Sequence, residues 1–156
     1  MSQKILIIGC GRVGSRLAVR LAGQGHEVTI VDEAREAFTQ LDTSFSGKTY
    51  QGSGLDHDIL KRAGAHDADV AVTVTGGDNR NLMIAQLLKH NFGVARSMAR
   101  LHDPVRAEIF HGFGIETLCT TTVVEGLLEI NINSGAFPEM PGEITVRGDA
   151  GRLETF

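Results

Sequence analysis

Apolar runs alternate with helix-like segments along most of this chain. The aliphatic run Lys4–Ile8 is followed by Val13, Leu17 and Leu21, which have the spacing of one helix face. Several of the runs are continuously apolar, which is typical of strands that are covered on both faces. The predicted strands are Lys4–Ile8, Glu27–Val31, Lys48–Gln51, Val70–Val74, Ser97–Leu101 and Glu116–Cys119. The predicted helices are Arg12–Ala22, Glu33–Leu41, Asp56–Ala63, Asp78–Asn91 and Pro104–His111, with one further helix after Cys119.

This alternation predicts a parallel sheet with right-handed crossovers. We therefore expect an α/β fold, a doubly wound Rossmann-like sheet, over residues 1–133. Residues 134–142 are rich in turn formers, and Glu143–Val146 and Arg152–Phe156 are predicted to pair as a short hairpin. Residues 134–156 are accordingly interpreted as a linker and a short C-terminal arm, or as the start of a truncated region.

The last predicted helix is apolar around much of its circumference. Its apolar residues are Val123, Val124, Leu127, Leu128, Ile130 and Ile132. Such a helix must be buried, either in its own core or against a second subunit. We favour a subunit contact, because the five preceding helices can already cover both faces of the sheet.

A glycine motif, Gly9-x-Gly11-x-x-Gly14, stands between the first predicted strand and the first predicted helix. In such a motif Gly9 allows the tight turn, Gly11 leaves room for a phosphate and Gly14 lets the helix approach the sheet. The helix start offers N–H groups and about half a positive charge to an anion. A glycine-rich turn without a ligand is the alternative. The strand, the helix and the acid that ends the next strand together favour nucleotide binding.

Two acids and one arginine are candidates for ligand contacts near this motif. Asp32 ends the second strand, where a carboxylate can accept both ribose hydroxyls and would repel a 2′-phosphate, so NADP is disfavoured. Glu33 either assists or begins the next helix as a first-turn acid, and we favour the helix role. Arg12 can fold over bound phosphates or can be a solvated surface residue, and the expected phosphate favours the first role.

Composition excludes several function classes. The net charge of the 156-residue chain is −4 with both signs interspersed, so no basic patch indicates nucleic-acid binding. No apolar run is long enough to cross a bilayer and no signal peptide precedes Lys4, so we expect a cytoplasmic protein that can dock on a membrane protein. Cys10 and Cys119 match neither a disulfide framework nor a metal site, and a redox role for either thiol is the less favoured alternative.

Three segments resemble a known family. They read GCGRVGSRLAVRLAGQGHEVTIVD, LKRAGAHDADVAVTVTGGDNRNLMIAQLLK and ARLHDPVRAEIFHGFGIETL. Over residues 4–132 the chain resembles the regulator-of-potassium-conductance (RCK) domain, also called the KTN or Trk-type nucleotide-binding domain. The resemblance implies a cytosolic regulatory subunit that binds NAD(H), ATP or ADP and passes the nucleotide state to the membrane pore of a potassium channel or transporter. It also implies a homodimer that assembles into a larger ring.

The resemblance further implies which residues bind the ligand. By position, the phosphates are held by Gly9, Gly11, Arg12, Val13 and Gly14, and the ribose by Asp32. The adenine lies beside Gly52, Ser53 and Leu55, the second half of the ligand is bordered by Thr73, Thr75 and Gly76, and the distal phosphate or ribose is reached by Arg100.

The chain departs from the family at two positions, and it ends before a further ligand-binding domain could fit. The family commonly has Gly-Asp where this chain has Gly52-Ser53, so the ligand preference can differ. Thr121-Thr122 replaces a Pro-Glu pair that binds a divalent ion in some members, so no metal site is expected. Many members continue with a second ligand domain after the Rossmann unit, so we interpret the chain as a fragment or a short member.

Two other function classes are alternatives to this interpretation. A small NAD-dependent oxidoreductase would need an acid–base group beside the nicotinamide. A Tyr-x-x-x-Lys pair is excluded, because the only tyrosine is Tyr50 and position 54 is Gly54. His102 is the best candidate base, but the chain has no room for a substrate domain, so we expect no enzymatic activity. The other class is a nucleotide-sensing module of another partner, such as an antiporter.

Overall fold

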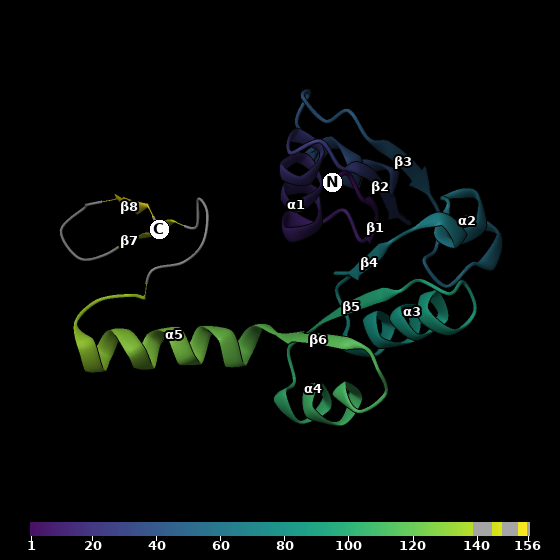
Figure 1. Cartoon of the computed structure of the whole chain (residues 1–156). Coiled ribbons are helices and arrows are strands. Elements are labelled where there is room, and N and C mark those ends of the chain that lie inside the picture. Colours follow the sequence, from purple (N-terminus) through teal and green to yellow (C-terminus); the bar gives the residue numbers. More distant parts are fainter. Residues whose placement is uncertain (139–144, 148–152, 156) are drawn as a thin grey trace. The chain divides into compact units, whose positions relative to one another are not determined.

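The structure, a computed structural model, describes residues 1–138, 145–147 and 153–155. Its main element is a six-stranded, all-parallel sheet in the order β3-β2-β1-β4-β5-β6 (Figure 1). The strands are β1 Lys4–Ile8, β2 Glu27–Asp32, β3 Lys48–Gln51, β4 Val70–Thr73, β5 Arg96–Leu101 and β6 Glu116–Cys119. This strand order is that of the doubly wound Rossmann fold, so the predicted fold class is confirmed.

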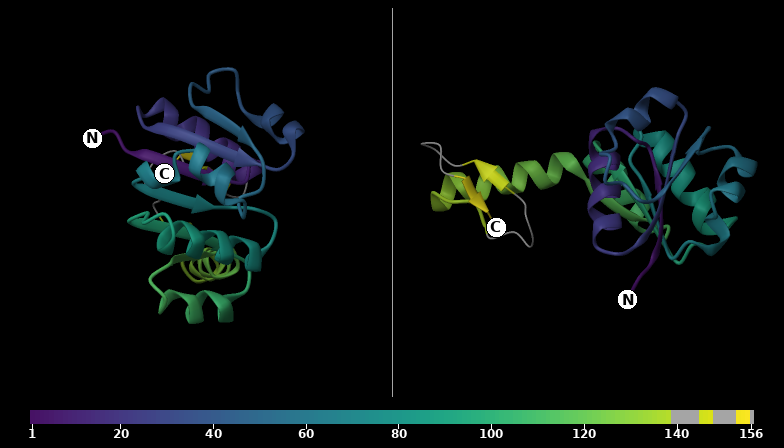
Figure 2. Two further views of the ribbon diagram at one scale, coloured as in Figure 1. Left: turned by 90° about the vertical axis from the view of Figure 1, so that its right-hand side faces the viewer. Right: turned by 90° about the horizontal axis from the view of Figure 1, so that it is seen from above.

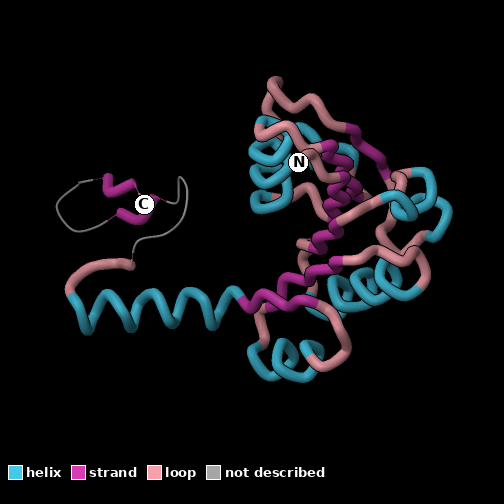
Figure 3. The backbone as a smooth tube through the Cα atoms, in the orientation of Figure 1, coloured by secondary structure: helices cyan, strands magenta, loops and turns pink. Residues whose placement is uncertain are grey.

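Helices cover the sheet on both faces (Figures 1 and 2). They are α1 Arg12–Gly23, η1 Arg35–Gln40, α2 His57–Arg62, η2 Ala65–Asp67, α3 Asp78–His90 and α4 Pro104–His111, where η denotes a 3-10 helix. A further helix, α5 Thr120–Ser134, follows β6 in the chain. The Asp103 carboxylate accepts a hydrogen bond from the Val105 amide, so it caps the start of α4. In the tube drawing, strands β1 to β6 form one continuous layer between these helices (Figure 3).

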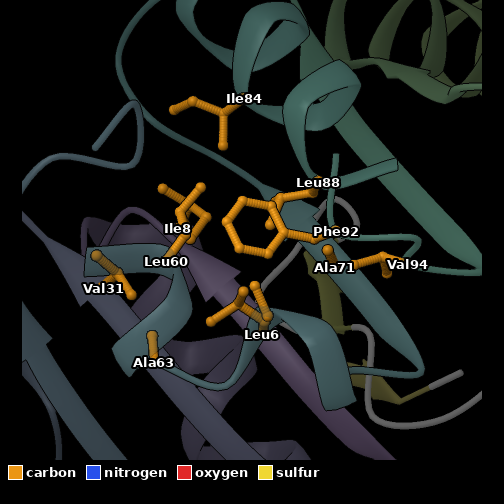
Figure 4. Packing of buried hydrophobic residues seen from close by; sticks show 11 residues of the cluster. Leu6, Ile8, Val31, Leu60, Ala63, Ala71, Ile84, Leu88, Phe92 and Val94 are labelled. Carbon is orange, nitrogen blue, oxygen red and sulfur yellow. The ribbon is translucent and has the colours of Figure 1, made fainter. Parts of the chain in front are cut away.

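The core lies on the two faces of the sheet because alternate residues of each strand point to opposite sides. On one face Ile5 and Ile7 pack with α1 and η1, through residues such as Ala18 and Phe38. On the other face, Leu6 packs in a cluster with α2 and α3, which Figure 4 shows closing around Ile8, Leu60, Ala71, Leu88 and Phe92. A third cluster joins α3 and α4 to β5 through residues that include Leu82 on α3, Ala99 and Leu101 on β5, and Ala107 and Phe110 on α4.

The predicted helix Glu33–Leu41 is wrong. The structure has a 3-10 helix over Arg35–Gln40 instead. Its tight turns show in hydrogen bonds to residues three positions back, from the Leu41 amide to Phe38 and from the Thr39 hydroxyl to Glu36. Such a threonine hydroxyl bond competes with regular helical bonding. Since η1 begins at Arg35, Glu33 precedes it and is not a first-turn acid.

The chain divides into two units, Met1–Cys119 and Thr120–Phe156, and the predicted domain division at residue 133 stays a prediction. In the second unit β7, Thr145–Arg147, pairs antiparallel with β8, Leu153–Thr155, which confirms a hairpin over these residues. The remaining parts of the predicted linker and hairpin, residues 139–144, 148–152 and 156, lie outside the described residues. None of the helices within the described residues is long and apolar enough to span a membrane.

Candidate functional site

The turn from β1 to α1 contains three glycines, and each has a different steric environment. Gly9 has a φ of +108°, and a Cβ there would lie 2.9 Å from the Val74 carbonyl carbon. A Cβ on Gly14 would lie 1.9 Å from the carbonyl oxygen of Gly9, because α1 packs directly against the turn. A Cβ on Gly11 would have nothing within 4 Å. The fold therefore requires Gly9 and Gly14, whereas Gly11 leaves open space beside the start of α1.

This open space adjoins backbone amides that the helix itself does not use. Gly11 is the N-cap residue of α1 and provides no side-chain cap, and the first helical bond runs from the Ser15 amide to the Gly11 carbonyl, 2.9 Å. The amides of Arg12, Val13 and Gly14 come before that bond and have no acceptor within the helix. The first turn also lacks an acidic residue, so its partial positive charge is available to an anion.

Asp32 is fixed beside the glycine turn by two backbone amides. Its Oδ2 accepts a hydrogen bond from the Cys10 amide at 2.7 Å, and its Oδ1 accepts one from the Ala34 amide at 2.9 Å. The Asp32 carbonyl also accepts from the Gly52 amide at 2.9 Å. Each carboxylate oxygen keeps acceptor capacity, because a carboxylate has about four lone-pair sites. Asp32 can therefore accept two further hydroxyl groups from a held position.

A crevice of about 190 Å³ opens at the carboxyl ends of β1, β2 and β4. It is lined by Ile8, Gly9, Asp32, Glu33, Gly52, Gly54, Thr75, Gly76, Arg80 and Ile84. Six of these residues were predicted as ligand contacts, namely Gly9, Asp32, Glu33, Gly52, Thr75 and Gly76. The other four, Ile8, Gly54, Arg80 and Ile84, are not among the predicted contacts, since no sequence motif marks them as ligand contacts.

The segment after β3 borders the crevice through two glycines. Gly52 has a φ of +154°, and a Cβ on Gly54 would lie 2.4 Å from Cγ2 of Ile8. Between them, the Ser53 hydroxyl accepts a hydrogen bond from the Leu55 amide at 3.2 Å, and the Leu55 side chain is exposed. Ser53 and Leu55 are not among the crevice-lining residues, so their predicted contact with adenine stays a prediction.

The second half of the edge is organised by Asn81, which is 1% exposed. Its Oδ1 accepts from the Thr75 amide at 2.8 Å and from the Thr75 hydroxyl at 2.7 Å. Its Nδ2 donates to the carbonyls of Thr75 at 3.2 Å and Arg100 at 2.8 Å. Asp78 similarly accepts from the amides of His102 and Asp103 at 2.9–3.0 Å. Helix α3 therefore ties together the loops that follow β4 and β5.

The structure places two predicted contacts of this half, Thr73 and Arg100, in different surroundings. Thr73 is fully buried, and its hydroxyl bonds to the carbonyl oxygens of Asn81 and Met98 at 3.0 and 3.1 Å. The Thr73 side chain points beneath α3 rather than into the crevice, and we correct its assignment to a structural one. Nη2 of Arg100 donates to the Thr75 carbonyl at 2.7 Å, and the predicted contact of Arg100 with the ligand stays a prediction. Its Nε is buried and has no partner among the described residues.

An ion pair joins the two sides of the crevice. Nη1 of Arg80, on α3, lies 3.4 Å from Oε2 of Glu33, which directly follows β2. Both side chains are about half exposed. Glu33 thus lines the crevice. Its position is compatible with the less favoured of its two predicted roles, which is to assist in ligand binding.

The remaining reactive groups give little indication of catalysis. Burial, and second the charge of Asp32, raise the pKa of Cys10 to about 11, so this thiol is protonated at neutral pH. His102, the best candidate base from the sequence, is not among the crevice-lining residues, and neither is any other histidine of the described chain. The described residues contain no group of three or more His, Cys, Asp and Glu side chains arranged for a metal ion.

The family model described as the TrkA-N domain matches residues 5–121. The chain is 41% identical over 135 residues to the Trk system potassium uptake protein TrkA of Streptomyces coelicolor, a match that covers 86% of this chain. The chain spans only 60% of the length of that relative.

Two solved structures share the fold. The Shewanella denitrificans Kef CTD in AMP-bound form is 26% identical with a TM-score of 0.67, and the match covers 85% of this chain and 82% of that one. The TrkA-N domain of inner membrane protein ybaL from Escherichia coli is 17% identical with a TM-score of 0.71, over 83% of this chain and 97% of that one. The second likeness supports the fold alone.

Proposed function

Because this chain belongs to the TrkA-N domain family, we propose that it is the nucleotide-binding regulatory part of a potassium transport system. The observation that carries the proposal is the pairing of two features at one sheet edge. The start of α1 has unused amides beside the open Gly11 position, and Asp32 is held next to it by the Cys10 amide. Such an edge suits an adenosine phosphate, with its anion at the helix start and its ribose at the acid.

The proposed ligand is NAD(H), ATP or ADP, bound across the carboxyl edge. The adenosine occupies the crevice between Asp32 and Gly52, its phosphates meet Gly9, Gly11, Val13 and Gly14 with the exposed Arg12, and its distal part reaches Thr75, Gly76 and Arg100. Two observations support the fit. A Cβ on Gly11 would meet open space, and the Arg100 Nε is a buried donor without a partner among the described residues. The AMP in the Kef CTD structure supports the adenosine end.

Regulation follows if different nucleotides contact the distal end differently. NADH would place a second ribose near Arg100, and ATP would place a third phosphate near Arg12 or Arg100. Only such a difference in contacts can shift a conformational equilibrium, and about 1–3 kcal/mol is a typical coupling free energy between two sites. Because the Streptomyces relative is named a potassium uptake protein, the proposed role is a switch for a potassium channel or transporter rather than an enzyme.

The proposed partners are a membrane-embedded potassium channel or transporter subunit and further copies of this chain. Such a partner places the chain in the cytoplasm, at the inner face of the cell membrane. Helix α5 carries Val124, Leu128 and Ile132 at four-residue spacing, all of them exposed, which supports an apolar contact between subunits in a dimer and a larger ring.

The test is calorimetric titration of the purified chain with AMP, ADP, ATP, NAD and NADH. The proposal predicts saturable binding of one nucleotide per chain, with different affinities for ATP and NADH. Small-angle scattering with each ligand should then give different subunit spacings. Binding of none of the five would overturn the nucleotide assignment, and identical scattering for all ligands would overturn the switch.

A further inference from the structure

The ion pair between Arg80 and Glu33 joins the two halves of the crevice. Glu33 stands on the loop after β2, in the half that holds Asp32, and Arg80 is the third residue of α3, in the half organised by Asn81. The distance between Arg80 Nη1 and Glu33 Oε2 is 3.4 Å, and the two side chains are 51% and 52% exposed. Their charges therefore meet at the surface of the crevice.

This ion pair is expected to contribute little to the stability of the fold. An ion pair that is half exposed to water is screened and contributes little to the free energy of folding. In the described structure, the Glu33 carboxylate has Arg80 as its recorded partner, while the Glu33 backbone carbonyl accepts from Gln51 Nε2 at 3.3 Å. The loop is thus held by its backbone, and the carboxylate is left to hold Arg80.

The position of Arg80 matches the adenosine end of the crevice rather than the phosphate end. Ile84, one helical turn further along α3, lines the crevice together with Gly54 and Ile8, which give that part apolar walls. Asp32, the ribose acceptor, is the residue directly before Glu33. A guanidinium held by Glu33 is also less available to a phosphate, because its charge is already paired.

We propose that Arg80 is a specificity-determining residue that closes over the adenosine of the bound nucleotide, held in place by Glu33. This inference rests on the proposed function and assigns Arg80 to the base and ribose. The planar guanidinium can stack on an adenine face, which an ammonium group cannot do as well. We call the Arg80–Glu33 ion pair the adenosine clasp. It joins α3 to the loop after β2, so a nucleotide that contacts it couples these two elements.

Calorimetry on Arg80→Gln tests the clasp. If Arg80 contacts adenosine, the Kd values of AMP and ATP should both rise by the same factor, about 10-fold. Glu33→Gln should raise both by a smaller common factor, and the double variant should be no weaker than Arg80→Gln, since Glu33 acts through Arg80. Arg80→Lys should keep the ion pair but recover little of the affinity.

The control is Arg106→Gln, which removes an arginine of α4 that contacts Asp103 and Asn79 and does not line the crevice. It should leave both Kd values unchanged, and the melting temperatures of all variants should stay close to wild type. A larger loss for ATP than for AMP would assign Arg80 to the phosphates and overturn the clasp, as would unchanged binding in Arg80→Gln. Absence of nucleotide binding by the wild type would instead reject the proposed function itself.

Discussion

The two halves of the crevice are held in shape by different kinds of contact. In the first half, β1 to β3, the edge is shaped by backbone, with Gly9 and Gly14 in close contact and Asp32 tied to main-chain amides. In the second half, β4 to β6, the edge is held by side chains, because Asn81 hydrogen-bonds to Thr75 after β4 and to Arg100 near the end of β5. Close backbone packing at two glycines thus shapes the first half, and a buried polar side chain organises the second.

This difference indicates which substitutions should disrupt the structure of each half. A backbone contact fails when any side chain is added, since neighbouring main-chain atoms cannot move away cheaply. A side-chain hub fails when it is removed, since its partners stay buried without acceptors or donors. The effect of a ligand contact can be measured apart from both kinds of structural contact at residues such as Arg12, whose exposed side chain does not support the fold.

The largest effect is expected from Gly14→Val in the first half. The new Cβ would lie within 1.9 Å of the Gly9 carbonyl oxygen, so α1 must move off the turn. We expect a loss of about 4 kcal/mol in the free energy of unfolding, measured by urea denaturation. Gly23→Ala, at the other end of α1, is the matched control, because a Cβ there meets nothing within 4 Å and alanine favours helix. Equal stability of the two variants would refute the close packing.

The hub of the second half is broken by Asn81→Ala. It removes four hydrogen bonds from half-buried groups of Thr75 and Arg100, for an expected loss of about 2–3 kcal/mol. Hydrogen exchange should speed up at the amides after β4 and β5 while those of the β1–α1 turn keep their protection. Asn91→Ala, at an exposed asparagine that ends the same helix, should be close to neutral. Uniform loss of protection over both halves would contradict the separation.

Arg12→Ala separates ligand binding from the fold of the first half. Arg12 is exposed at the first position of α1, so its removal should leave the melting temperature unchanged. We expect the Kd of ATP to rise about 10-fold and that of adenosine to stay constant, since a charged hydrogen bond to phosphate is lost. Arg16→Ala, one turn further along α1 and also exposed, controls for net charge. Equal losses for ATP and adenosine would remove Arg12 from the phosphate site.

The smallest effect on stability is expected from Glu116→Gln, which removes the ion pair between Glu116 on β6 and Arg96 on β5. The side chain of Arg96 donates to both Glu116 oxygens and holds the pKa of that carboxyl below its ordinary value. The pair therefore stabilises the fold above the unfolded-state pKa and loses this contribution as the pH falls through the folded-state pKa. Melting curves should show a slight deficit at pH 7 that shrinks below pH 4.5, and a deficit that does not change with pH would argue against the pairing.

Sequence patterns predicted the first half better than the second for a physical reason. The glycine motif and Asp32 are local signals, each tied to one strand end. The predicted bounds of β1 and β3 are met in the first half and those of β6 and α4 in the second, so the difference lies in the contacts at the edge and not in the elements. The Asn81 hub depends on contacts between residues up to 19 positions apart, which periodicity does not report. The one available signal was a polar residue on the sheet-facing side of α3.

Two errors have the same origin in local interpretation. Thr73 follows a buried run and was assigned to the ligand, but strand alternation turns its side chain under α3. Glu33 was assigned to a helix that begins only at Arg35, and its partner Arg80 is 47 residues away. In both cases the deciding contact is tertiary.

The central claim is that a nucleotide phosphate binds at the start of α1, and Gly11→Asp tests it most directly. The fold tolerates a side chain at Gly11, and an N-cap aspartate would accept hydrogen bonds from the same first-turn amides that a phosphate needs. The account predicts a melting temperature equal to or above wild type together with at least 100-fold weaker binding of AMP and ATP by calorimetry. A variant that is as stable as wild type and binds both nucleotides with wild-type affinity would contradict it.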